Sequence, residues 1–262
     1  MTEDFLEIDI SKTKREEDLI EIRFRNEEFV QVNFFKLFSQ SKYIRDKYKY
    51  SEALDLLQQE IHDIEENMYI NSESIKLFIK VIEEEKLKFP IEHYKNIYTL
   101  SEYFCTSSIT TELDKISCEK LFQDLNFTIQ ILLDYERVNN GYESKLLIKI
   151  ENFLRTRINE CLSNRKFKEL SNSKIFRIIE ESRKVIDHNL LVDFILESVS
   201  TRFIMLKFAE FDKLSHDKVI TLIDFFEKQE DAVKKMYLEY IPFDLSFIKN
   251  IMNKCDQVLK EM

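Results

Sequence analysis

Glycine is almost missing from this sequence of 262 residues, which contains Gly141 alone, two prolines and no tryptophan. A phosphate-binding loop needs several glycines, because its backbone must approach the phosphates closely and adopt conformations that a Cβ atom disfavours. The chain therefore has no place for a Walker-type loop or a dinucleotide-binding turn, and we expect no cofactor.

Long apolar runs and an excess of positive charge are also missing. No segment approaches the roughly eighteen apolar residues that cross a bilayer, and the first twenty residues contain neither an uninterrupted apolar core nor a basic leader. We therefore expect a soluble protein without membrane association, in the cytoplasm or the nucleus. The 39 Lys and Arg residues stand against 49 Asp and Glu residues, a net charge of −10 with no basic patch. This balance opposes binding to nucleic acids.

The residue spacing offers no candidate for a metal site or for catalysis. The four cysteines lack the short paired spacing of a zinc site, and the four histidines fall in separate predicted elements. Cys105 and His93 share one predicted helix but lie about 18 Å of helix rise apart, too far for a nucleophile and its base. We expect reduced cysteines, no metal, no enzyme activity and no small-molecule substrate. The residues concerned are Cys105, Cys118, Cys161, Cys255, His62, His93, His188 and His216.

What the sequence does contain is a change of hydrophobic period within residues 28–45. Val30 and Val32 alternate with polar residues, as in a half-buried strand, and from Phe34 onward the apolar spacing is helical. A strand that leads directly into a helix is unusual in a chain whose other patterns are mostly helical. It is the feature most informative about the fold.

The remaining patterns predict a mostly helical α+β chain. A polar turn at Asn26 and Glu27 joins two alternating segments into a hairpin, and Asn71 begins a helix. Predicted strands cover residues 5–10, 19–24, 29–32, 68–70 and 86–89, and predicted helices cover residues 33–48, 51–67, 71–82, 90–105 and 109–121. The helix opened by Pro90 is predicted to place on one face Ile91, Tyr94, Ile97, Tyr98, Ser101, Phe104 and Cys105.

Residues 18–44 resemble the opening of a BTB/POZ domain. In that family an acidic residue precedes the first strand, and the second strand leads into a helix followed by a Ser-x-Tyr/Phe signature. Here these features are Asp18, the segment FVQVNFFKLFSQS, and Ser41 to Tyr43. Residues 74–113 are similar to the later half of the family, in which a helix and a short strand precede a second helix.

The resemblance covers about residues 16–122 and implies a small sheet flanked by helices. The chain departs from the family at Asn33, where histidine is usual, and over residues 51–67, which are longer and more helical than the usual connection. An unrelated α+β domain is the open alternative.

The second half contains a repeat. FKELSNSKIFRII, residues 167–179, aligns with FDKLSHDKVITLI, residues 211–223, at an offset of 44 positions. Ser171 and Ser215 are placed to cap the helix that follows, and an amphipathic helical segment precedes each copy. This pattern is similar to the BACK region that commonly follows a BTB domain and predicts stacked helical hairpins. A generic HEAT-like array is the alternative.

These resemblances imply an N-terminal arm over residues 1–17, a BTB/POZ-like domain over residues 18–124 and an all-α BACK-like region over residues 125–262. BTB/POZ domains usually dimerise, and many are adaptors that hold a cullin-type ubiquitin ligase scaffold while another region holds the substrate. The resemblance thus implies a non-enzymatic, homodimeric adaptor for protein partners. A structural or transcription-associated scaffold without a ligase, and a wholly helical repeat protein that binds peptides, stay open.

Two sets of residues are predicted to bind partners. The first is the alternating strand of Leu6, Ile8 and Ile10, because an edge strand with an apolar face needs a partner; the strand either exchanges between two copies as a dimer interface or pairs within its own chain. The second follows from the resemblance, since cullin binding in the family uses a hydrophobic-x-acidic element. The matching residues are Ile61, Asp63, Ile64 and Glu66. A plain amphipathic helix is the alternative for these four.

Overall fold

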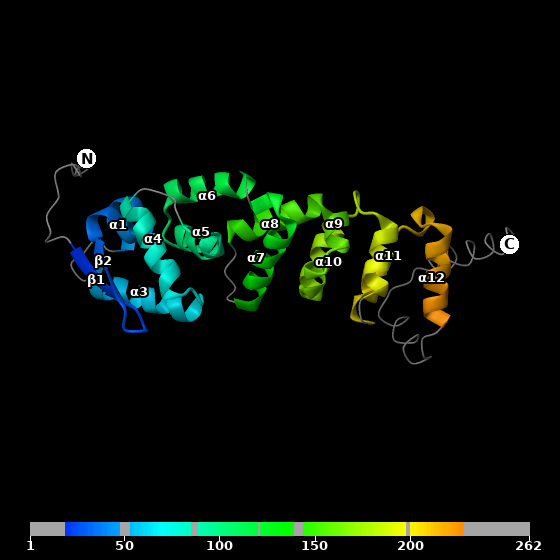
Figure 1. Cartoon of the computed structure of the whole chain (residues 1–262), viewed down its shortest axis with the longest axis horizontal. Coiled ribbons are helices and arrows are strands. Elements are labelled where there is room, and N and C mark those ends of the chain that lie inside the picture. The colour runs from blue at the N-terminus through cyan, green and yellow to red at the C-terminus, as the bar shows by residue number, and fades with distance from the viewer. Residues whose placement is uncertain are drawn as a thin grey trace, which may run out of the picture. The chain divides into compact units, whose positions relative to one another are not determined.

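The computed structural model describes residues 19–47, 53–84, 89–119, 121–138, 144–197 and 200–227 (Figure 1). These residues are mostly helical, with one two-stranded antiparallel sheet near the N-terminal end of the chain. The predicted α+β class with a mostly helical content is thus confirmed. The chain divides into two compact units, residues 1–116 and 117–262. The domain limits predicted from the resemblance stay predictions.

Strands β1 (Leu19–Arg23) and β2 (Phe29–Asn33) form the predicted hairpin. The strands are antiparallel, and Ile22 lies opposite Val30. Successive side chains of a strand point to opposite faces of the sheet. Here Ile22 of β1 and Val32 of β2 are buried, whereas the adjacent Glu21, Arg23 and Gln31 are exposed. The alternation in the sequence therefore predicted both the strands and their buried face.

The hairpin turns over the three residues from Arg25 to Glu27, one more than predicted. The N–H of Glu27 donates to the carbonyl of Phe24 at 3.1 Å, and the N–H of Phe24 donates to the carbonyl of Glu28 at 2.8 Å. Glu27 has a φ of 66°, in the left-handed region that glycine usually occupies in a turn of this length. A side chain with a Cβ atom costs about 1 kcal/mol in this conformation.

We expect Glu27→Gly to stabilise the protein by about 0.5–1 kcal/mol, because glycine adopts a positive φ without a steric clash. The greater freedom of glycine in the unfolded chain offsets part of the gain. Glu27→Ala is the matched control, since it removes the same carboxylate and keeps the Cβ atom. Urea denaturation should show a higher free energy of unfolding for the glycine variant alone. Equal stability of the two variants would contradict the expected strain.

Strand β2 runs directly into α1 (Phe34–Gln40), as the change of period predicts. Asn33 is extended, and its Oδ1 accepts the N–H of Lys36 at 3.1 Å, which caps the first turn of the helix. The N–H of Asn33 donates to the carboxylate of Glu83 at 2.8 Å. Asn33 therefore joins the strand to the helix and links both to α4, a distant element of the chain.

Ser41 divides what was predicted as one helix into α1 and α2 (Lys42–Lys47). The backbone is extended at Ser41, and its Oγ accepts the N–H of Ile44 at 3.1 Å. The same hydroxyl donates to the carbonyl of Phe104 at 2.6 Å and is fully buried. One side chain thus caps the second helix and fixes the corner to the core.

Helices α3 (Ala53–Asn67) and α4 (Ser72–Glu84) follow, and the described residues between them form no strand. Tyr69 has a φ of 52°, a left-handed conformation that cannot continue a strand. The strand predicted over residues 68–70 is therefore wrong. Of the strand predicted over residues 86–89, all but the last residue lies outside the described residues.

The core of the N-terminal unit is centred on α4 and α5 (Tyr94–Tyr103), and α6 (Ser107–Glu119) adds Ile109 and Leu113 to it. Asn71 caps α4 as predicted, because its Oδ1 accepts the N–H of Ser74 at 2.8 Å. The buried apolar residues of α4 are Ile75, Phe78, Ile79, Val81 and Ile82, and those of α5 include the predicted Tyr94, Ile97 and Tyr98, with Phe104 directly after α5. These side chains make the periodic faces that the sequence predicts.

The two ends of the face predicted after Pro90 lie outside this core. Pro90 precedes η3 (Ile91–His93), a 3-10 turn, and Ile91 is 43 % exposed. Cys105 follows the end of α5 with a φ of 52° and is exposed. The prediction fails at both ends because the period of 3.6 residues does not continue through a 3-10 turn or past the helix end.

The second unit consists of short helices and 3-10 turns. In order these are η4 (Leu121–Gln123), α7 (Leu125–Val138), α8 (Lys145–Thr156), α9 (Ile158–Leu162), η5 (Lys166–Glu169), α10 (Asn172–Glu181), α11 (His188–Leu196), η6 (Ser200–Phe208), η7 (Phe211–Lys213) and α12 (His216–Glu227). The elements from α8 to α10 recur one repeat period later, so that α8 corresponds to α11, α9 to η6, η5 to η7 and α10 to α12. The repeat in the sequence is therefore a repeat in the structure.

Both copies hold their last helix with a lysine at the same position of the motif. Lys174 of α10 contacts Glu151 of α8 with 2.7 Å between Nζ and Oε1, and Lys218 of α12 forms an ion pair with Asp193 of α11. The two acids do not align in the sequence repeat. Both copies therefore have the lysine–carboxylate interaction, but the acidic residue stands at a different position of the repeat in each copy.

A third copy of the corner precedes these two and lacks the sequence motif. Turn η4 leads to Asp124, whose Oδ1 accepts the N–H of Phe127 at 3.1 Å and caps α7. Ser171 does the same for α10, with its Oγ accepting the N–H of Lys174 at 3.3 Å. Positions four, seven and eight after the cap are buried in both helices: Thr128, Ile131 and Leu132 in α7, and Ile175, Ile178 and Ile179 in α10.

Candidate functional site

Strand β1 has one edge that is not paired with β2. Alternate residues of an antiparallel strand bond to the neighbouring strand, and on β1 these are Ile20 and Ile22. The backbone N–H and C=O groups of Leu19, Glu21 and Arg23 therefore point away from β2. An exposed row of such groups is a template for an added strand.

Gln58 of α3 closes this edge at one end. Its Oε1 accepts the N–H of Arg23 at 2.7 Å, and its Nε2 donates to the carbonyl of Arg23. The Nε2 atom of His62 lies 3.1 Å from the same carbonyl. The amide of Gln58 thus makes the two bonds that a neighbouring strand would make. Within the described residues, no hydrogen bond occupies the outward backbone groups of Leu19 and Glu21.

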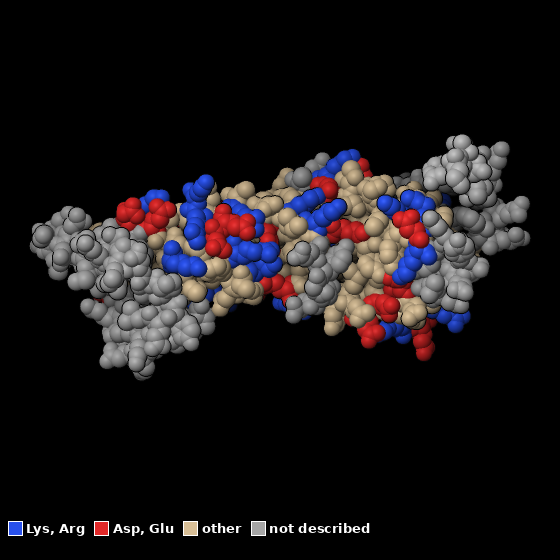
Figure 2. All heavy atoms as spheres, turned by 180° about the vertical axis from the view of Figure 1, so that it is seen from behind, with Lys and Arg blue, Asp and Glu red and all other residues tan. Residues whose placement is uncertain are grey.

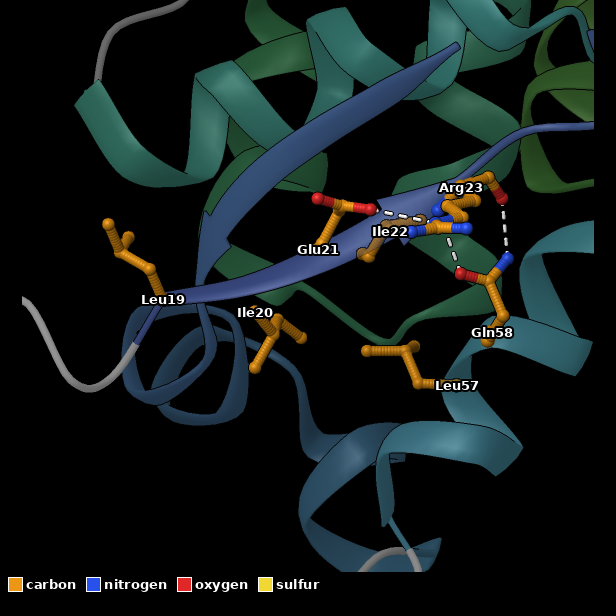
Figure 3. A pocket seen from close by; sticks show the side chains of 7 residues that line it. All are labelled: Leu19, Ile20, Glu21, Ile22, Arg23, Leu57 and Gln58. Atoms are coloured by element: carbon orange, nitrogen blue, oxygen red, sulfur yellow. Dashed lines mark hydrogen bonds and ion pairs between the residues drawn. The ribbon is translucent and has the colours of Figure 1, made fainter. Parts of the chain in front are cut away.

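A hollow of about 370 Å³ lies between this edge and α3 (Figure 3). Ile20 and Leu57 project into the hollow, and Gln58 lies at the Arg23 end. Arg23 Nε donates to Glu21 Oε1 at 2.7 Å on the outer side of the strand. Apolar side chains beside unpaired backbone groups suit an extended polypeptide, which pairs through its main chain and inserts alternate side chains.

Sequence reasoning missed Gln58. It occupies a polar position of a predicted amphipathic helix, where a solvent-facing glutamine is expected. Its role depends on the distance between α3 and β1, which is a tertiary property. A two-stranded hairpin followed by a helix suggests that some polar side chain of the helix pairs with the free strand edge. This pattern does not indicate which residue of the helix does so.

The first predicted partner-binding set, Leu6, Ile8 and Ile10, lies outside the described residues. Their role as a dimer interface stays a prediction.

The second predicted set lies on α3 and is divided between the core and the surface. Ile61 and Ile64 are 2 % and 1 % exposed, whereas Asp63 and Glu66 are exposed. Glu66 forms an ion pair with Arg25 at the hairpin turn. The isoleucines therefore pack in the N-terminal unit and are not available to a partner. Partner binding at this helix stays a prediction, and of the four predicted residues only Asp63 and Glu66 are exposed to a partner.

Ser74, His93 and Glu73 have the sequence of contacts found in a nucleophile and its base. His93 Nδ1 lies 2.9 Å from Ser74 Oγ, and His93 Nε2 lies 3.9 Å from Glu73 Oε1. Asn96 Nδ2 also donates to Ser74 Oγ, at 3.0 Å. Ser74 is fully buried, so a substrate cannot reach its hydroxyl without opening the core. The group instead joins the start of α4 to η3.

Glu151 is a buried carboxylate in the second unit, 2 % exposed and surrounded by cations. Lys174 contacts it at 2.7 Å, Arg155 lies 3.6 Å away and Arg177 completes the group. Burial alone would raise the pKa of Glu151, but hydrogen bonds from Arg177 and Lys174 hold it below the ordinary value of 4.5. The carboxylate therefore stays ionised and joins α8 to α10.

The face drawn in Figure 2 carries acidic and basic side chains interspersed, without a large area of one sign among the described residues. No group of three or more His, Cys, Asp or Glu side chains in the described part of the chain could hold a metal ion. Burial raises the pKa of the Cys161 thiol to about 12, which keeps it protonated and unreactive. Among the helices that the structure describes, none combines the length and the apolar character needed to cross a bilayer.

Comparison with known proteins gives no relative: no family model, no curated protein and no solved structure matches the chain. The BTB/POZ and BACK resemblances therefore rest on the residues quoted above and on the elements that these residues form.

Proposed function

We propose that the chain is a non-enzymatic adaptor that binds protein partners, in the cytoplasm or the nucleus, through a BTB/POZ-like N-terminal unit and a BACK-like helical region. The observation that carries this proposal is the junction from β2 through α1 to Ser41, because it gives the resembling segment a hairpin, a directly joined helix and a buried serine corner. The structural repeat of α8 to α10 supports the second half of the proposal.

The alternatives are affected differently by the structure. The hairpin of β1 and β2 contradicts a wholly helical repeat protein. A scaffold without a ligase has the same fold as the ligase adaptor and differs from it only in its partners. Binding to a cullin distinguishes these two functions.

Asp63→Lys is expected to weaken binding to a cullin scaffold by roughly tenfold or more, because reversing an interfacial charge replaces attraction by repulsion. Asp63 is exposed and makes no hydrogen bond or ion pair with the described residues, so the substitution leaves the fold intact. Ile61→Ala is unsuitable, since it would create a cavity in the core. The measurement is the dissociation constant for a purified cullin N-terminal region.

Glu180→Lys is the matched control for this experiment. Glu180 is an exposed acid on α10 and belongs to the other unit, so its reversal changes the net charge equally without touching α3. Equal weakening by both variants would indicate a nonspecific charge effect. Failure of the unmodified chain to bind any cullin would leave the scaffold function instead.

A further inference from the structure

Helix α3 bonds to the outer edge of β1 through side chains that share one helix face. These are Gln58, His62 and Glu65, spaced at i, i+4 and i+7. Gln58 bonds to the N–H and the carbonyl of Arg23, and His62 Nε2 lies 3.1 Å from the same carbonyl. Glu65 Oε2 accepts the N–H of Arg25 at 3.2 Å. We infer that this row of side chains, and Gln58 above all, keeps β1 from pairing with β1 of a second copy of the chain.

The side chains are needed for this because the helix itself leaves the edge open. A hollow of about 370 Å³ separates the edge from α3, and Gln58 lies at its Arg23 end (Figure 3). The outward backbone groups of Leu19 and Glu21 lie on exposed residues, where water can bond to them, so the edge needs no occupant. It is nevertheless a template for another strand, and proteins protect such edges by keeping them short or charged.

Gln58 shortens the edge that another strand could use. Strand β1 spans 5 residues, Leu19–Arg23, and its outward backbone groups belong to Leu19, Glu21 and Arg23. Because Arg23 is already bonded to Gln58, only residues 19–21 stay open. A stretch of about three residues is the lower limit of strand length.

Symmetry makes this effect larger when the second strand is β1 itself. Two β1 strands that overlap over their full length pair antiparallel about a twofold axis at Glu21, so that Leu19 of each copy lies opposite Arg23 of the other. Gln58 therefore removes the hydrogen-bonded pairs at both ends of the overlap. The central pair would place the two Glu21 side chains directly opposite each other, where like charges destabilise a sheet.

Gln58→Ala tests the inference, and Gln59→Ala is the matched control. Gln59 is the next residue of α3, is exposed and bonds to no described residue, so its truncation leaves Arg23 covered. Sedimentation equilibrium of the full chain measures self-association. The association constant of Gln58→Ala should exceed those of the unmodified chain and of the control by roughly tenfold or more, because Arg23 then pairs with Leu19 at both ends of the overlap.

Amide hydrogen exchange, followed by NMR, locates the contact between the copies. In Gln58→Ala the amide of Glu21 should exchange more slowly as the protein concentration rises, because its N–H bonds to the second copy. The amide of Val32, which pairs with Ile20 inside the hairpin, should stay protected in every variant. Glu21→Thr, added to Gln58→Ala, should strengthen the association further, since it removes the like charges at the centre.

The inference is overturned if Gln58→Ala associates no more strongly than Gln59→Ala. It is equally overturned if the mass rises while the Glu21 amide stays unprotected, because the copies then meet at another surface. Loss of protection at Val32 would show that Gln58 holds the hairpin together instead of covering its edge. Concentration-dependent protection of Glu21 in the unmodified chain would show that the edge is not blocked. These outcomes concern contact between hairpins alone and leave the adaptor function untouched.

Discussion

Glu151→Gln is expected to lower the free energy of unfolding by about 2–4 kcal/mol at neutral pH, because it leaves several cations around a neutral amide in a buried position. The loss should be smaller than for a fully enclosed pair, since the side chain of Arg177 is 49 % exposed and its charge is partly screened by solvent. Urea denaturation measures the effect. Glu181→Gln is the control: its carboxylate contacts Arg155 at 2.7 Å but is 46 % exposed, and its loss should cost under about 0.5 kcal/mol.

The effect of Glu151→Gln should depend on pH. The pKa of Glu151 in the folded protein lies below the ordinary value of 4.5, so the unfolded chain takes up a proton first as the pH falls. The stability that the carboxylate provides is therefore fully present above pH 4.5 and is lost as the pH falls through the folded pKa. The difference between the unmodified protein and Glu151→Gln should shrink on acidification. A difference that stays constant down to about pH 3 would show that the ionised carboxylate is not its source.

Arg202→Ile is expected to destabilise the second unit by about 2–3 kcal/mol, although isoleucine stands at the equivalent place of the preceding copy, as Ile158. The guanidinium of Arg202 donates to the carbonyl of Lys168 at 2.6 Å and to Asn172 Oδ1 at 2.9 Å, and it lies over the ring of Phe194. Isoleucine would remove these bonds and leave the part-buried carbonyl of Lys168 and the buried carbonyl of Leu170 without the guanidinium donor. The free energy of unfolding measures the loss.

Arg202→Lys is the companion variant, because it keeps the charge and the apolar stem but not the planar fork that reaches two acceptors at once. Its stability should fall between those of the unmodified protein and Arg202→Ile. If Arg202→Ile were as stable as the unmodified protein, the hydrogen bonds across the corner would contribute nothing, and simple apolar packing would suffice as it does in the preceding copy.

The sequence predicted correctly those strands and helix starts that are determined by residues close to one another in the chain. The alternation of Val30 and Val32 fixed the hairpin and its buried face, and Asn33 and Asn71 begin their helices because their short side chains accept backbone N–H groups within the next turn. The repeat was visible because each copy buries the same corner leucine, Leu170 or Leu214. In each case a few neighbouring residues determine the outcome.

The predictions that failed depend on contacts between distant residues or on backbone strain. The break at Ser41 is held by the carbonyl of Phe104, which no local pattern reveals. The extended spacing over residues 68–70 is overridden by the positive φ of Tyr69. The pattern of a hydrophobe before an acid also does not say which side of α3 faces the core, and in the structure Ile61 is buried there; partner binding at this helix stays a prediction. The free edge of β1 likewise became visible only with α3 in place.

The bonds of Arg202 also bear on how the second unit unfolds. Stacked copies that contact only their neighbours can open one at a time, so that the unit loses its structure in steps. Arg202 belongs to the second copy and bonds to residues 168–172 at the corner of the first. Opening either copy exposes polar groups that the other has buried, which raises the free energy of every partly open state. A single arginine at this boundary therefore favours cooperative unfolding in a chain whose repeated construction would otherwise allow gradual fraying.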